Sequence, residues 1–166
     1  SSSPTAVGPP AESLHLLNDD ESYWDFFVKY RHRRTIVYAG GNDGMLHAFN
    51  GGWYDKTSAQ FYGNKSGYTN WDLGQETWAF VPYNLLPHLS YLSRPTYGLK
   101  GGDHAYYVDQ TPYVFDAKIF GDDGVTGQSG ATNTHPNGWG TVLVVGFGMG
   151  GGLAEVYPDP RDTSSS

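Results

Sequence analysis

An aromatic cluster in residues 51–72 is the part of the sequence best suited to recognition chemistry. Its six rings stand among Gly, Asn, Ser, Thr and Lys residues; they are Trp53, Tyr54, Phe61, Tyr62, Tyr68 and Trp71. Rigid amphipathic rings supply contact area, and small polar residues adapt their hydrogen bonds to a ligand. The mixture predicts a binding surface that stacks on sugar rings or docks on another protein. The same composition also fits a long hairpin excursion whose rings cover the domain itself or a neighbouring chain.

Metal-binding and nucleophilic chemistry have weaker support. No two of the six histidines stand at the i, i+4 spacing of a helical metal site, and no His-Glu-x-x-His motif occurs. His47 alternates with Met45 and Phe49 in a strand pattern, which predicts a packed, hydrogen-bonded histidine. The chain has no cysteine, so disulfides, iron–sulfur clusters and a thiol nucleophile are excluded. No Gly-x-Ser-x-Gly motif is present. We therefore predict no catalytic residue and no metal ligand.

Two acidic or glycine-rich runs are interpreted as turns. Asp122, Asp123 and Gly124 resemble a piece of a calcium loop, but the alternating Asp/Asn series and the terminal Glu are missing. Residues 42–44 (NDG) have the composition of a tight hairpin turn, because Asp-Gly accepts positive φ angles. No cofactor is predicted, and calcium stays open as an alternative without a full loop motif.

Composition indicates the fold class. The chain has 166 residues and a formal charge of −7; charged residues make up 16 % and aromatic residues another 16 %. Low charge, many rings and 23 glycines indicate turn-rich β structure. A tight, sequence-independent nucleic-acid binder would carry a basic surplus, so this class is disfavoured. The longest apolar run, residues 141–147, is too short to cross a bilayer, and no membrane span is predicted.

The elements expected to position these residues follow from periodicity. Residues 1–11 are interpreted as an extended lead-in and residues 12–30 as a helix in one or two pieces, with Ser22 or Asp20 capping the second. An i, i+3, i+4, i+7 stripe marks its apolar face: Tyr23, Phe26, Phe27 and Tyr30. The basic residues 31–34 are interpreted as a helix end with a solvated face.

Strands are expected through the rest of the chain, with one more short helix. A short helix is predicted around Leu85–Leu92, bounded by Pro82 and Pro95. The predicted strands are residues 35–39 and 45–49, joined as a hairpin, and residues 76–81, 106–109, 112–120 and 141–147. Residues 121–138 are expected to form a loop, and residues 148–152 a flexible turn.

Two stretches carry a resemblance to known repeats. Residues 37–49 (VYAGGNDGMLHAF), followed by residues 74–82 (GQETWAFVP), resemble the quinoprotein-type propeller repeat. More narrowly, the chain resembles the C-terminal propeller domain of the PilY family of type IV pilus tip and biogenesis proteins. The matching pieces occur in the family's order and cover most of residues 3–152; the other main pieces are residues 85–87 (LLP), 107–109 (YVD) and 141–146 (TVLVVG).

The resemblance implies a fold and a domain organisation. The expected fold is mostly β, an incomplete β-propeller of antiparallel blade-like units with short helical insertions. The whole of 1–166 is predicted to be one partial propeller domain: 1–34 lead-in and helix, 35–152 blade-like units, 153–166 tail. The chain has material for only part of the family's propeller, which predicts a fragment, a truncated paralogue or one part of an assembly. Residues 153–160 match the family poorly, and its calcium loop has no convincing counterpart.

The resemblance also implies a function. It predicts a non-enzymatic, extracellular or cell-surface module in type IV pilus assembly or tip adhesion. Expected partners are pilus or minor-pilin-type proteins, further segments that complete the propeller, or host and surface glycans. Two alternatives stay open: a structural subunit of an extracellular filament or surface assembly, and a fragment of a pyrroloquinoline-quinone-dependent oxidoreductase.

Overall fold

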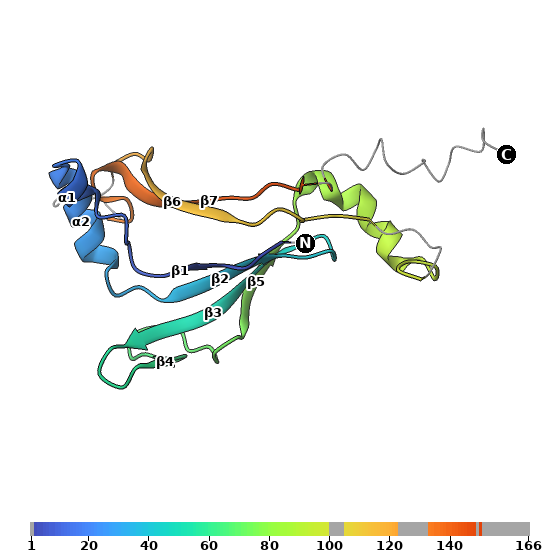
Figure 1. Ribbon diagram of the computed structural model, residues 1–166, viewed down its shortest axis with the longest axis horizontal. Coiled ribbons are helices and arrows are strands. Elements are labelled where there is room, and N and C mark those ends of the chain that lie inside the picture. The colour runs from blue at the N-terminus through green and yellow to red at the C-terminus, as the bar shows by residue number, and fades with distance from the viewer. Residues whose placement is uncertain (1, 100–104, 123–132, 149, 151–166) are drawn as a thin grey trace.

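A five-stranded antiparallel sheet forms the larger part of the molecule (Figure 1). The computed structural model describes residues 2–99, 105–122, 133–148 and 150. Strands β1, β2, β3 and β4 follow one another in the sheet, and β5 pairs with β3 on the stretch that β4 leaves open. The bounds are Thr5–Val7 for β1, Thr35–Gly40 for β2, Leu46–Asp55 for β3, Gln60–Tyr62 for β4 and Glu76–Phe80 for β5. The strands predicted at residues 35–39, 45–49 and 76–81 are therefore confirmed.

The turn between β2 and β3 has the predicted hairpin geometry. The Asp43 carboxylate accepts a hydrogen bond from the Met45 backbone N–H at 3.1 Å. Gly44 has a φ of +90°, and a Cβ on it would lie 2.4 Å from Leu89 Cδ2. Glycine is thus required at this position by both backbone conformation and space.

A second sheet has two antiparallel strands, β6 (Tyr113–Lys118) and β7 (Trp139–Val144). It lies beside β1, and the Thr5 hydroxyl donates to the Pro112 carbonyl across the junction at 2.6 Å (Figure 1). The strand predicted at residues 141–147 is β7, which begins two residues earlier, at Trp139, and ends at Val144. Residues 145–147 do not pair with β6. Of these, Phe147 accepts a backbone hydrogen bond from Asp109 instead.

Helices close the two ends of the molecule (Figure 1). At one end stand α1 (Leu14–Leu17) and α2 (Glu21–Tyr30), the latter capped by the Asp20 side chain, which accepts from the Ser22 N–H at 3.0 Å. The predicted stripe is confirmed: Tyr23 and Phe26 are buried in a cluster with Trp139, and the other two rings pack on it. Aromatic packing of this kind anchors α2 to β7.

At the other end, residues 83–93 form the 3-10 helix η1 (Tyr83–Ser93), where a short helix was predicted. Pro87 inside it removes one backbone donor and favours short helical turns over a continuous α-helix. Leu85 of this helix is buried against Ala105, Tyr107 and Val108. A second 3-10 turn, η2 (Pro136–Gly138), precedes β7.

Two expectations about local structure were wrong. Residues 1–11 contain strand β1, because Thr5–Val7 pairs with Ile36–Tyr38. Residues 106–109 are not a strand. The buried side chains of Tyr107 and Val108 fill the core under η1, and the backbone bonds from Val108 to Gly41 and from Asp109 to Phe147 are long, at 3.3 and 3.4 Å. An apolar run can be required by a core without pairing in a sheet.

The propeller prediction is not confirmed. Over the residues that the structure describes, the sheets are antiparallel, helices are short, and no closed barrel or propeller is present. Asp123, Gly124 and most of residues 148–152 lie outside the described parts, as does the tail, so the division into units stays a prediction. Among the described helices, none is long and apolar enough to span a bilayer.

A polar network centred on Arg33 ties the two sheets to α2. Its guanidinium donates to the Gly8 carbonyl at 2.5 Å and to the Thr141 hydroxyl at 2.6 Å. That hydroxyl donates to Asp116 at 2.7 Å, and the other Asp116 oxygen accepts from the Tyr23 hydroxyl at 2.6 Å. Burial lowers the pKa of Arg33, although the negative charge of Asp116 opposes this. The pKa of Tyr23 is raised by burial and by its bond to Asp116.

We expect Arg33→Met to lower the free energy of unfolding by about 1–3 kcal/mol, since it leaves the half-buried Thr141 hydroxyl and Gly8 carbonyl without their donor. Chemical denaturation would measure the change. Arg31→Met is the matched control, because Arg31 is exposed two residues away and its loss should cost less than about 0.5 kcal/mol. Equal effects of the two substitutions would contradict a central role for Arg33.

Candidate functional site

Asn50 is the residue that organises the aromatic insertion. Its side chain is 1 % exposed, and its amide N–H groups donate to the carbonyls of Trp71 at 2.7 Å and Asp72 at 3.1 Å. Its side-chain oxygen accepts from the Gly52 N–H at 2.9 Å, and its backbone bonds Gly74 and Gln75. One buried amide therefore holds both ends of the insertion together. Sequence reasoning missed Asn50, and the only signal was a polar residue at an inward position of an alternating strand.

Arg34 lies over two of the predicted rings. Its guanidinium carbon is 4.4 Å from the ring centroid of Trp53 and 4.4 Å from that of Trp71. The same guanidinium donates to the carbonyl of Thr69. The Trp53 indole N–H in turn donates to the His32 carbonyl at 3.1 Å. Cation–π contacts and these bonds fix the insertion against the segment that follows α2.

The structure divides the six predicted site residues into two groups. Trp53, Trp71 and Tyr68 gather around the basic side chains; Tyr68 meets Trp53 edge-on at 5.0 Å. Tyr54 and Phe61 face each other across β3 and β4 with centroids 5.1 Å apart. Tyr62 pairs with Trp53 in register and donates its hydroxyl to Ser58. A single continuous stacking surface is therefore not formed.

Exposure differs between the rings. Trp53 is 9 % exposed, so it is a core residue of the insertion and has little surface for a ligand. Tyr54, Phe61, Tyr62 and Tyr68 are each about half exposed. Both interpretations of the segment thus apply to different residues: some rings cover the domain, and others face solvent. Whether the exposed ones bind a ligand stays a prediction.

A depression of about 400 Å³ opens beside Tyr68. Its lining is polar apart from the one ring, and consists of Asn64, Lys65, Ser66, Gly67, Tyr68 and Asn70. The Lys65 ammonium lies 5.5 Å from the Tyr68 centroid and 5.7 Å from the Trp53 centroid. An ammonium, two amides, a hydroxyl and an aromatic ring can together hold a small polar ligand.

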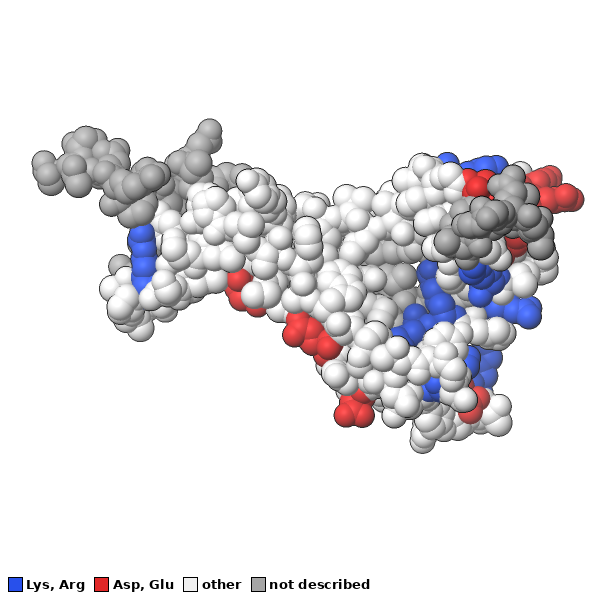
Figure 2. Space-filling model, turned by 180° about the vertical axis from the view of Figure 1, so that it is seen from behind, with Lys and Arg blue, Asp and Glu red and all other residues white. Residues whose placement is uncertain are grey.

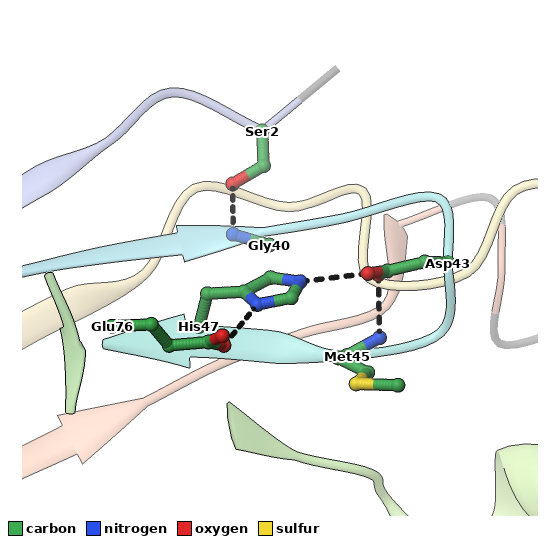
Figure 3. A network of polar contacts seen from close by, with 6 residues as sticks. All are labelled: Ser2, Gly40, Asp43, Met45, His47 and Glu76. Atoms are coloured by element: carbon green, nitrogen blue, oxygen red, sulfur yellow. Dashed lines mark hydrogen bonds and ion pairs between the residues drawn. The ribbon is translucent and has the colours of Figure 1, made fainter. Parts of the chain in front are cut away.

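His47 is hydrogen-bonded on both ring nitrogens, as predicted. Figure 3 shows its ring between the Asp43 carboxylate of the β2–β3 turn and the Glu76 carboxylate of β5. The Nδ1–Glu76 distance is 2.7 Å and the Nε2–Asp43 distance is 2.9 Å. Burial alone would lower the pKa of His47, but the bonds and negative charges of the two carboxylates outweigh it and raise the pKa. The histidine thus acts as a clamp between turn and strand.

The interpretation of the basic residues 31–34 was partly wrong. Arg31 and His32 are exposed at the end of α2, as expected. Arg33 and Arg34 are half-buried, because their donors satisfy backbone carbonyls of distant segments. A run of four basic residues does not reveal which of them face inward.

Among the described residues, no group of three or more His, Asp or Glu side chains could hold a metal ion. Asp122, predicted as part of a turn, accepts a hydrogen bond from the Asn137 backbone N–H at 3.0 Å. The rest of the calcium-like run, Asp123 and Gly124, lies outside the described residues. That the protein has no cofactor stays a prediction.

Fold and site together define an antiparallel β domain with an aromatic and basic insertion between β3 and β5. The chain is 34 % identical over 153 residues, 90 % of its length, to the type IV pilus biogenesis factor PilY1 of Pseudomonas aeruginosa strain UCBPP-PA14. It is 31 % identical over 128 residues, 75 % of its length, to a PilY1 homolog of Xylella fastidiosa. The resemblance to the PilY family is therefore confirmed.

The match concerns one segment of much longer proteins. The chain spans 10 % of the length of the Pseudomonas relative and 6 % of the Xylella relative. No protein-family model matches the chain. No solved structure matches it either.

We expect Asn50→Ala to lower the free energy of unfolding by about 1–3 kcal/mol, because several buried backbone groups lose their partners. Amide exchange should accelerate most at Gly52, whose N–H loses its acceptor, and less at Gly74, whose N–H bonds the backbone carbonyl that the substitution keeps. Asn70→Ala is the control, since Asn70 is exposed in the same insertion. A uniform rise in exchange over the whole chain, or none, would contradict the local role of Asn50.

The His47 clamp predicts a pH dependence of stability. Because the folded pKa is raised above the ordinary value of 6.5, the clamp's contribution is complete below about pH 6.5. It is lost as the pH rises through the folded pKa. Both carboxylates are about half exposed, so the loss should be at most about 1 kcal/mol. Denaturation between pH 5.5 and 8.5 measures it, with His47→Gln expected to remove the dependence and His32→Gln to leave it. Stability that rises with pH through this window would refute the clamp.

Proposed function

We propose that this chain is part of a cell-surface protein that acts in type IV pilus biogenesis, where it serves as a non-enzymatic interaction module. The observation that carries the proposal is the 34 % identity to PilY1 over 90 % of the chain. The proposed partners are pilus or minor-pilin-type proteins.

The proposed architecture is part of a propeller. Strands β1, β2, β3 and β5 form an antiparallel meander of four strands, the number in a propeller blade. Strands β6 and β7 start a second sheet, and an apolar groove of about 300 Å³ opens between it and the first. Trp78 and Phe80 of β5 line this groove while 43 % and 56 % exposed. Further strands that extend the second sheet would cover these rings.

This exposed groove also favours a second candidate, a structural subunit whose neighbours supply the covering strands. Uncovered strand edges promote association unless another segment pairs with them. The two candidates differ in what supplies the strands: the same polypeptide in a propeller, or another subunit in an assembly.

Gene deletion tests the proposed role. In the organism that encodes the chain, loss of the gene should remove most surface pili, measured as pilin in the sheared-filament fraction. The intact gene should restore the pili. The gene with Arg33→Met should restore fewer than the gene with Arg31→Met, because only the first weakens the fold. Unchanged piliation after deletion would refute the role in biogenesis.

A further inference from the structure

Basic side chains gather at one end of this acidic protein, where acidic side chains also lie (Figure 2). Figure 2 shows most of the Lys and Arg side chains around a hollow at the end that carries α2 and the insertion. Lys29 and Arg33 lie over the ring of Tyr30, and Arg34 and Lys65 lie over the ring of Trp53. The basic side chains are therefore interleaved with aromatic rings.

Two of these cations, Arg34 and Lys65, have no acidic partner close by among the described residues. No carboxylate of the described residues lies within ion-pair distance of Arg34 or Lys65. Aromatic rings and the Thr69 carbonyl take the place of acidic partners. The Lys65 ammonium is consequently open to an ion pair with an anionic ligand.

The depression beside Lys65 is held in place before any ligand arrives. Two residues next to its lining in the sequence are held by hydrogen bonds. The Asn50 amide donates to the Trp71 carbonyl, and the Arg34 guanidinium donates to the Thr69 carbonyl. Within the lining itself, the Tyr68 N–H donates to the Lys65 carbonyl at 3.1 Å. Gly67 has a φ of +84°, with no atom within 4 Å of where a Cβ would stand. A preorganised polar site loses less entropy on binding.

We propose that this depression binds a carboxylate-bearing sugar, such as one uronic-acid or sialic-acid unit of an acidic polysaccharide. Lys65 would pair with the carboxylate, the amides of Asn64 and Asn70 would meet hydroxyls, and the ring of Tyr68 would contact the apolar face of the sugar. The site stands on its own geometry and does not depend on the pilus role.

Size and lining favour a sugar over an acidic peptide. A volume of about 400 Å³ suits a small cyclic ligand. A peptide bound in extended form would need an open strand edge or an apolar groove, and the lining of this depression offers neither. Two amides and a hydroxyl around one cation match a ligand with many hydroxyls and a single charge.

Titration calorimetry of the full chain tests the proposal with two probes, oligogalacturonate and sialyllactose. We expect at least one of them to bind, more weakly as salt increases. Lys65→Met and Tyr68→Ala should each weaken that binding about tenfold, the effect of losing one charge-assisted bond or one ring contact. The matched controls are Lys56→Met and Tyr54→Ala, which change the same residue types outside the depression and should leave affinity within about twofold.

Several results would overturn the inference. These are no binding of either probe at low salt, equal binding of neutral galactan or lactose, equal binding of a polyglutamate peptide, or equal losses in the control variants. Thermal unfolding of each variant guards against a folding defect. If Tyr68→Ala is unstable, Tyr68→Leu keeps the bulk and removes the aromatic face, and full affinity in that variant would likewise count against the site.

Discussion

The Arg33 guanidinium is the interaction on which the arrangement of the molecule depends. It joins a carbonyl beside β1 to a hydroxyl on β7, and through Asp116 it reaches α2. The Thr5 hydroxyl, which donates to the Pro112 carbonyl, is a second polar link between the sheets, but it does not reach α2. A cation withdrawn from water is costly unless it is hydrogen-bonded, so the partners of the half-buried Arg33 favour one relative position of the sheets.

Asn50 has the same role on a smaller scale. A buried amide that both donates and accepts can close an excursion of some twenty residues by bonding carbonyls from its far end. Arg34 then fixes this excursion against the end of α2 through two indole rings. The insertion is therefore attached to the domain by specific contacts, although it lies at the surface.

Local elements could be predicted from the sequence, and long-range polar contacts could not. The hairpin at Asp43 and the stripe from Tyr23 have short periods that a single chain reveals. The inward direction of Arg33 and the loop bonds of Asn50 depend on partners about a hundred and about twenty residues away. Tyr107 was misjudged for a related reason: an apolar run looks alike in a strand and in an irregular core segment. Composition singled out six aromatic residues as a predicted binding surface. Which of these rings are buried and which are exposed depends on how β3 and β4 pair, and composition does not reveal that pairing.

The chemistry of the insertion follows from what neutralises its cations. In most domains a half-buried arginine pairs with a carboxylate, and the pair presents little net charge. Here Arg34 is held by ring faces and a carbonyl, which stabilise a cation without cancelling its charge. The same rings that build the insertion therefore hold Arg34 without an ion-pair partner among the described residues, in a protein of net charge −7. Lys65 lies against the rings of Trp53 and Tyr68 in the same way, so its ammonium is left to pair with an anion from outside the chain.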